Sequence, residues 1–192
     1  MQPSALNLLY VVTEDWYFLS HRLPMARAAR DAGFKVHVAT RVVEGREKIE
    51  AEGFVVHPVS FARGKTSLAA SLRTIAELRR AQREVKPAVT HHVAVQASVL
   101  GSLAALGLPG GRVNALTGFG YTFIANTLRT RVLRTVIAGL LRWLINRPDA
   151  VALVQNPNDR ESLTALGIAP NRIRLIAGSG VDTERQIGRA HV

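Results

Sequence analysis

The residues best suited to chemistry follow the first apolar run of the chain. Residues 6–12 (LNLLYVV) lead into the polar and aromatic segment 14–24 (EDWYFLSHRLP). We predict a strand over 6–12, a turn, and then a helix whose start is capped by Ser20, with Pro24 in its first turn. His21 and Arg22 then lie at the carboxyl end of the first strand, where open parallel sheets bind ligands.

The side chains of His21 and Arg22 suit a reaction at a hydroxyl group beside a phosphate. An imidazole can orient or deprotonate a hydroxyl, and a guanidinium or a helix N-terminus can stabilise the charge of a departing diphosphate. The alternative is that Ser20 and His21 only cap a helix and that Asp15 and Trp16 pack a loop.

Two later segments are weaker candidates for a ligand-binding or catalytic site. His91 and His92 end a predicted strand over 88–93, and because adjacent strand residues face opposite ways, only one of them can point at a given cleft. A structural role is the commoner one for such a histidine. Residues 117–121 (TGFGY) leave another predicted strand; Gly118 and Gly120 permit close ligand approach or merely a tight turn.

The elements that position these residues alternate regularly along the chain. Apolar β-rich runs predict strands over 6–12, 34–39, 54–59, 88–93, 113–116, 150–154 and 174–176. Helical spacing predicts helices over 23–32, 46–52, 68–86, 95–106 and 127–147, and Gly33 and Gly53 each follow a helix end. The alternation predicts an α/β domain with a Rossmann-like, doubly wound parallel sheet.

Composition excludes several classes of protein. The 192 residues include no cysteine, so disulfides, thiol nucleophiles and cysteine-bound metals are excluded. The first strand-to-helix turn has no glycine, which argues against NAD or FAD, and no further ligand at suitable spacing accompanies His91 and His92, so we expect no metal. The absence of a spanning apolar run and of a basic N-terminal start predicts a cytoplasmic protein.

The formal net charge of +11 favours nucleic acid, an anionic membrane or a phosphorylated ligand. The arginines lack the aromatic interleaving of nucleic-acid modules, so we expect no nucleic-acid partner. On the helix over 127–147, Arg131, Arg134 and Arg142 share one face and Trp143 lies with valines and leucines on the other. Such a helix can lie on an anionic leaflet or can pack its apolar face on the sheet, and the second is slightly favoured.

Four segments, in order, resemble the N-terminal domain of glycosyltransferase family 4 enzymes, which have the GT-B fold. The segments are 15–40 (DWYFLSHRLPMARAARDAGFKVHVAT), 91–105 (HHVAVQASVLGSLAA), 114–123 (NALTGFGYTF) and 154–182, which opens VQNPNDRESLTALGI and ends IRLIAGSGVD. The resemblance implies a single N-terminal, acceptor-side half of a GT-B fold over residues 1–182. Residues 183–192 are interpreted as a truncated linker with a non-native tail.

The resemblance also implies a function. Similar enzymes are retaining, hexosyltransferase-type proteins that move sugar from a nucleotide sugar to a lipid-linked saccharide in cell-surface polysaccharide synthesis. They bind the donor mainly through a C-terminal domain, so this chain alone is expected to be inactive, and no cofactor is implied. A protein of this kind is peripheral on the inner face of the cell membrane. The alternative is a non-catalytic basic α/β module that binds nucleic acid or a phosphorylated partner.

The site residues implied by the resemblance fall into two groups. His21 and His92 are the expected catalytic residues, and the residues expected to bind acceptor or phosphate are Asp15, Trp16, Arg22, Gly118, Gly120 and Tyr121. The helical pattern adds a membrane-facing group formed by Arg131, Arg134, Arg142 and Trp143.

Overall fold

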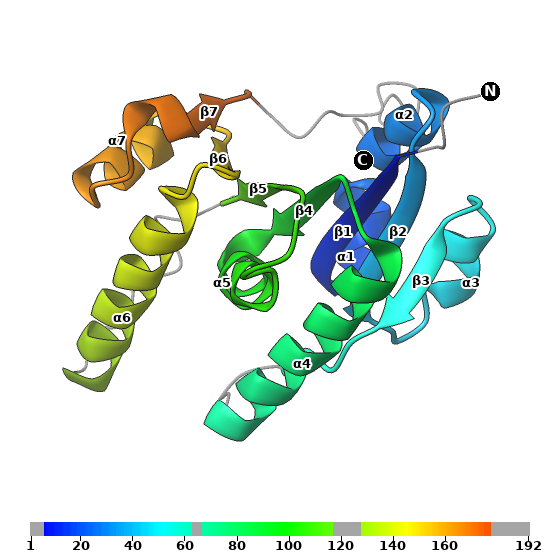
Figure 1. Ribbon diagram of the computed structural model, residues 1–192, viewed down its shortest axis with the longest axis horizontal. Helices are drawn as coiled ribbons and strands as arrows, with labels where there is room; N and C mark the ends of the chain where they lie inside the picture. Colours follow the sequence, from blue (N-terminus) through cyan, green and yellow to red (C-terminus); the bar gives the residue numbers. More distant parts are fainter. Residues whose placement is uncertain (1–5, 63–66, 117–127, 178–192) are drawn as a thin grey trace, which may run out of the picture.

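A computed structural model describes residues 6–62, 67–116 and 128–177, which form one parallel seven-stranded sheet with helices on both faces (Figure 1). The strands are β1 (Asn7–Glu14), β2 (Lys35–Arg41), β3 (Val55–Pro58), β4 (Val89–Val93), β5 (Gly111–Ala115), β6 (Ala150–Val154) and β7 (Ile173–Leu175). The helices are α1 (Asp15–His21), α2 (Leu23–Asp31), α3 (Arg46–Glu50), α4 (Leu68–Val85), α5 (Ala94–Ala104), α6 (Leu128–Ile145), α7 (Pro157–Ala165) and the 3-10 turn η2 (Pro170–Arg172). The strand order is β3-β2-β1-β4-β5-β6-β7.

The doubly wound parallel sheet predicted from the alternation of elements is confirmed. Each predicted strand is present, with ends that shift by at most a few residues, and every strand pair is parallel. Gly33 and Gly53 have φ of +92° and +80° where α2 and the α3 turn end, a conformation that glycine adopts without a Cβ clash. Local signals therefore place the helix ends correctly.

The segment between β1 and α2 differs from the prediction. It is a helix, α1, rather than a turn, and Phe18 on its inner side is buried. Ser20 does not cap α2: its hydroxyl donates to the carbonyl of Trp16, one turn back, at 2.8 Å. The N-cap of α2 is Arg22, which makes no side-chain capping bond, although Pro24 does lie in the first turn. The predicted capping role of Ser20 was wrong because burial of Phe18 favours a full helical turn here.

The two faces of the sheet are covered by different helices. Leu8, Tyr10 and Val12 of β1 point to the face covered by α1, α2 and α3, and Leu9 and Val11 point to the face covered by α4 and α5. Along the second face, α4, α5 and α6 lie next to one another (Figure 1). Side chains of β1 enter the two cores alternately, because successive side chains of a strand point to opposite faces of the sheet.

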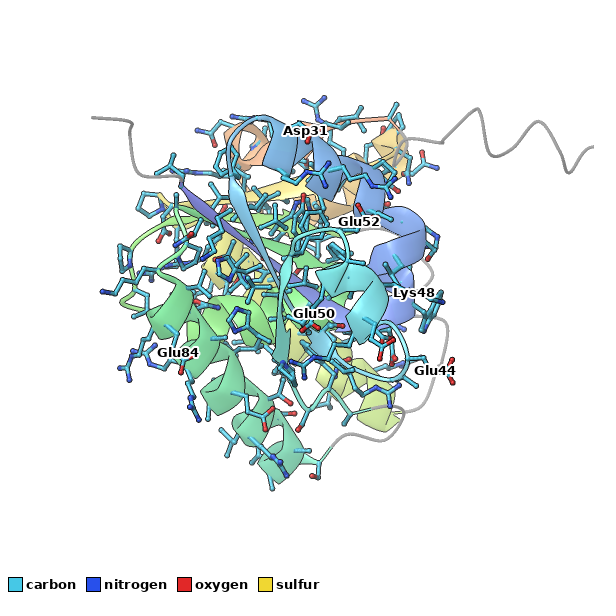
Figure 2. The ribbon with its side chains drawn as sticks, turned by 90° about the vertical axis from the view of Figure 1, so that its right-hand side faces the viewer. Asp31, Glu44, Lys48, Glu50, Glu52 and Glu84 are labelled. Atoms are coloured by element: carbon cyan, nitrogen blue, oxygen red, sulfur yellow. The ribbon has the colours of Figure 1, made fainter. Side chains whose placement is uncertain are left out.

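The edge formed by β3 and α3 is joined to α2 by ion pairs. The guanidinium of Arg27 binds both carboxylate oxygens of Glu52, and Nη1 of Arg30 donates to the Glu52 carbonyl at 3.1 Å. Figure 2 faces this edge, with Asp31 on α2 above and Glu52 below it. These contacts hold α2 in the position from which its first residues meet the end of β1.

Candidate functional site

The first part of the candidate site is a ledge of aromatic and polar side chains on α1, formed by Trp16, Tyr17, Ser20 and His21. Trp16 is 54% exposed, its ring meets that of Tyr17 edge-on at 5.7 Å, and Tyr17 stacks on His21 at 4.2 Å with 8° between the ring planes. Since α1 follows β1 directly, this α1 ledge lies at the carboxyl end of the sheet. Aromatic faces attract polarised C–H groups, so the ledge can pack against a sugar ring.

The imidazole of His21 is oriented by its neighbour. The Ser20 hydroxyl donates to the Trp16 carbonyl at 2.8 Å, and Ser20 Oγ lies 2.7 Å from His21 Nδ1. In the tautomer with its hydrogen on Nδ1, His21 donates to Ser20 Oγ and Nε2 keeps a lone pair. His21 is exposed, and the lone pair can therefore accept the proton of a substrate hydroxyl.

The second part is Arg22, whose side chain is buried beside the ledge. Arg22 is 1% exposed, and its Nε, Nη1 and Nη2 atoms make no hydrogen bond within the described residues. Burial lowers the pKa of Arg22, and the nearby Tyr17 and Tyr10 oppose this effect. A buried charge without a partner is expensive, so this position is suited to an anion that completes its hydrogen bonds.

The two histidines of β4 lie on opposite sides of the sheet. His91 stacks on Tyr10 at 5.1 Å, on the face that carries α1 and α2, and its Nε2 has no hydrogen-bond partner in the described ranges. Burial, followed by the charges of Arg22 and His92, lowers the pKa of His91 to about 3. The charge of Arg22 acts on both His91 and Tyr10, so these two residues are part of its surroundings. The sequence named His91 only as a weaker candidate and did not point to Tyr10.

His92, predicted to be catalytic, lies elsewhere. It is 0% exposed, and its Nδ1 donates to Asn114 Oδ1 at 2.9 Å beneath α5. Burial lowers the pKa of His92 to about 4, although the bond to Asn114 opposes this. A Cβ at Gly101 would lie 2.5 Å from Nε2 of His92. The structure does not bring His92 to the α1 ledge, and its contacts indicate a packing role.

Asp15, predicted to bind acceptor or phosphate, holds a loop in place. Its Oδ2 accepts from the backbone amides of Val43, Glu44 and Gly45 at 2.6, 3.0 and 2.8 Å, and its Oδ1 accepts from the Trp16 amide at 2.8 Å. Burial opposes ionisation of Asp15, but these amides outweigh it and lower the pKa of the carboxyl. The contacts indicate that Asp15 fixes the β2–α3 loop. The predicted residues Gly118, Gly120 and Tyr121 lie outside the described residues.

Helix α6 exposes part of the apolar face that was expected to pack on the sheet. Leu141, Leu144 and Ile145 are buried, whereas Val132, Val136 and Trp143 are exposed, Trp143 to 49%. Arg131 and Arg142 are exposed as well, and Arg134 is half-buried. Arg134, from the predicted arginine face, is thus partly covered, and Trp143, from the predicted apolar face, is exposed. Each of the two predicted faces therefore contains both covered and exposed side chains.

The part of the chain that the structure describes has neither a candidate metal centre nor a helix that could span a membrane. No three His, Cys, Asp or Glu side chains there could hold a metal ion. No helix there is long and apolar enough to cross a bilayer.

Known structures share this fold at low sequence identity. A glycosyltransferase from Rickettsia africae ESF-5 is 9% identical with a TM-score of 0.63, over 91% of this chain and 43% of that one. HepE of Anabaena, in complex with UDP-glucose, is 13% identical with a TM-score of 0.62, over 92% and 44%. A UDP-N-acetylglucosamine 2-epimerase from Rickettsia bellii is 12% identical with a TM-score of 0.60, over 91% and 45%. The chain thus spans less than half the length of these structures and corresponds to one half of a GT-B fold.

These similar structures include a glycosyltransferase and an epimerase, and a match of the sequence to a family profile distinguishes between the two classes of protein. No curated protein sequence matches the chain significantly, but the profile of Glycosyltransferase Family 4 matches residues 23–185. The matched range starts in the first turn of α2 and includes every later strand and helix of the described structure. The chain therefore belongs to glycosyltransferase family 4.

Proposed function

We propose that residues 1–182 are the N-terminal, acceptor-binding domain of a retaining, nucleotide-sugar-dependent hexosyltransferase. Its acceptor is a lipid-linked saccharide in cell-surface polysaccharide synthesis. The observation that carries this proposal is the exposed α1 ledge at the carboxyl end of β1, next to the buried Arg22, whose guanidinium makes no hydrogen bond with the described residues. The nucleotide sugar is the donor substrate and is bound mainly by a second domain, in agreement with the partial coverage of the related structures.

The proposal gives each side chain of the site a separate task. Trp16 and Tyr17 pack against a sugar ring of the acceptor, and Nε2 of His21 orients the attacking hydroxyl and accepts its proton. Arg22 stabilises the charge of a phosphate group. Ser20 acts through His21, because it holds the ring in the tautomer that leaves Nε2 free.

The experiment that tests this proposal uses the full-length protein with a panel of nucleotide sugars and a lipid-linked saccharide. Replacing His21 by Ala should lower kcat/KM by about 100-fold, the usual contribution of a positioned acid-base group. The Tm should hardly change, because His21 is exposed. The control is His57→Ala, on β3 and on the sheet face opposite Tyr10, which should keep its kcat/KM.

Two outcomes would contradict the proposal. The first is a full-length protein that transfers no sugar from any nucleotide donor to a lipid-linked saccharide. The second is a His21→Ala variant with unchanged kcat/KM, which would mean that His21 only packs against Tyr17.

We further propose that α6 contacts an anionic membrane surface, so that the protein is peripheral on the inner leaflet. Between Glu84 and Asp149 the sequence has no acidic residue, so α6 has no acidic residue of its own. Arg131 and Arg142 flank the exposed Val132, Val136 and Trp143, and the Arg147 guanidinium lies 5.6 Å from the centre of the Trp143 ring. An aromatic anchor among cations suits the interface of an anionic bilayer.

Vesicle co-sedimentation tests the membrane contact. The chain should bind phosphatidylglycerol vesicles, should not bind phosphatidylcholine vesicles, and should be released by salt, since each basic residue near the surface contributes about 1 kcal/mol. Arg131→Glu with Arg142→Glu should abolish binding, whereas Arg73→Glu with Arg80→Glu on α4 should reduce it little. Equal binding to both lipids, or to neither, would place acceptor capture elsewhere.

A further inference from the structure

We propose that Arg22 and His91 form one buried site for a phosphoryl group, at which the anion bound by Arg22 is taken up together with a proton that goes to His91. The inference rests on the proposed function for the source of the phosphoryl group, which is either the nucleotide sugar or the lipid diphosphate of the acceptor. It adds His91 to the site and predicts that anion binding and protonation are linked.

The two groups are buried on the same face of the sheet, and each has side-chain nitrogens without a hydrogen bond among the described residues. Arg22 comes from the junction of α1 and α2, and His91 comes from β4, where it pairs in register with Tyr10 of β1. All three side-chain nitrogens of Arg22 and the Nε2 atom of His91 are buried without a hydrogen bond in the described chain. Two unsatisfied groups in one place are a recurrent mark of a ligand site, because native proteins rarely leave such atoms unpaired.

Among the residues that the structure describes, none supplies a negative charge to Arg22 or His91. The groups whose charges act on Arg22 are Tyr10 and Tyr17, and those acting on His91 are Arg22 and His92. No ion pair joins Arg22 to a carboxylate within the described ranges. Burial raises the pKa of Tyr10 to about 12, so its phenol stays neutral and cannot supply the missing negative charge.

The chemistry of the two groups fits a tetrahedral oxyanion with two negative charges. A guanidinium presents a planar fork that binds two phosphate oxygens, and a third oxygen can accept a hydrogen bond from Nε2–H of His91. Without ligand, burial and the Arg22 charge keep His91 neutral, with a pKa of about 3. A dianion beside both groups reverses the sign of the local field, so the charged form of His91 becomes the favoured one. The proton comes from solvent and no covalent bond is made or broken.

Sulfate is a suitable probe of this linkage, because it is a tetrahedral dianion with no proton to exchange near pH 5 to 6. Any proton taken up on binding then belongs to the protein. The Kd of the 192-residue chain for sulfate should fall about tenfold from pH 6 to pH 5, the slope for uptake of one proton. Histidine ¹⁵N NMR should show His91 as imidazolium in the sulfate-saturated chain and as neutral imidazole in its absence.

Variants assign the two roles separately. His91→Phe keeps an aromatic ring against Tyr10 and should bind sulfate with the same Kd at both pH values, whereas Arg22→Gln should lose binding. The matched controls are His37→Phe and Arg79→Gln, which change a buried histidine and an arginine on the sheet face opposite Tyr10. Both controls should keep the tenfold pH dependence.

Competition identifies the source of the phosphoryl group. Displacement of sulfate by UDP or GDP assigns the site to the donor, and displacement by farnesyl diphosphate assigns it to the acceptor lipid. The inference is overturned if none of these displaces sulfate, if the sulfate Kd is the same at both pH values, or if His91 stays neutral when sulfate is bound. A full-length protein that transfers no sugar, although the chain binds sulfate with a proton, would refute the proposed function alone.

Discussion

Replacing Arg22 by Met should make the unliganded chain more stable. The guanidinium leaves three buried nitrogens without hydrogen bonds, and one unsatisfied buried polar group already costs about 1–3 kcal/mol, more when it is charged. Met keeps an unbranched apolar stem but leaves some space where the guanidinium was, which costs about 1–2 kcal/mol. The net gain in the free energy of unfolding is then about 2 kcal/mol, or about 4–8 °C in Tm for a chain of this size.

The assay is calorimetric unfolding at pH 7.5 in a buffer free of phosphate and sulfate. At pH 5.5, where uptake of a proton with the anion favours binding, added sulfate should raise the Tm of the wild type more than that of Arg22→Met, since only the wild type binds the anion. Arg112→Met is the matched control: Arg112 is also buried, but it donates to the Ala105 carbonyl at 3.1 Å and pairs with Asp149 at 2.8 Å. Its loss should lower stability by about 3 kcal/mol.

The reasoning is refuted if Arg22→Met lowers the free energy of unfolding by 1 kcal/mol or more in the sulfate-free buffer. Such a result would mean that the guanidinium has a partner inside the folded chain. Arg22 would then be a structural residue, and the site would lack its anion-binding group.

Three further predictions concern buried polar groups. Burial lowers the pKa values of His37, His91 and His92 to about 4, 3 and 4. Because the unfolded chain then binds protons at a higher pH than the folded one, the free energy of unfolding should fall below about pH 6.5, by about 1.4 kcal/mol per pH unit for each histidine. Unfolding followed by circular dichroism at a series of pH values checks this. His92→Phe should make that loss shallower, and an unchanged slope would contradict the assignment. Gly101→Ala places a Cβ 2.4 Å from the His92 ring and should cost about 1–3 kcal/mol in urea unfolding, a cost that His92→Ala in the same chain should largely remove; additive effects would refute the contact. Asp15→Ala leaves the buried Gly45 amide and its neighbours without their acceptor and should cost about 3 kcal/mol, with faster amide hydrogen exchange in the β2–α3 loop; unchanged exchange would show that the loop is held by other contacts.

The sequence alone determined the order and type of most elements. The alternation of apolar runs with helical spacing predicted seven strands, and the structure confirms them as one parallel sheet. Gly33 and Gly53 marked the ends of α2 and the α3 turn, since positive φ is a local requirement that the residue type itself meets. The order of the four motifs was likewise sufficient to identify the family, because motif order is a property of the sequence and does not depend on tertiary contacts.

Features that depend on neighbours distant in sequence could not be predicted. α1 was expected to be a turn, because the packing of Phe18 against the sheet is invisible in a segment rich in polar residues. Asp15 lay beside the candidate site in sequence, yet its carboxylate binds amides about 30 residues away. The helical wheel of α6 put its three arginines on one face, but it could not show that Arg134 is half-buried while Arg131 and Arg142 are exposed, because that depends on the elements packed against the helix.

The choice between the two histidines of β4 shows this limit most directly. Alternation along a strand requires His91 and His92 to face opposite ways, but it does not say which side carries the ligand. The register of β1 with β4, which pairs Tyr10 with His91, and the packing of α1 and α2 on that same face make the decision. Burial is likewise a tertiary property. The sequence placed Arg22 at a helix start, and only the packed sheet and helices around it removed its guanidinium from water and left its nitrogens without a hydrogen bond among the described residues.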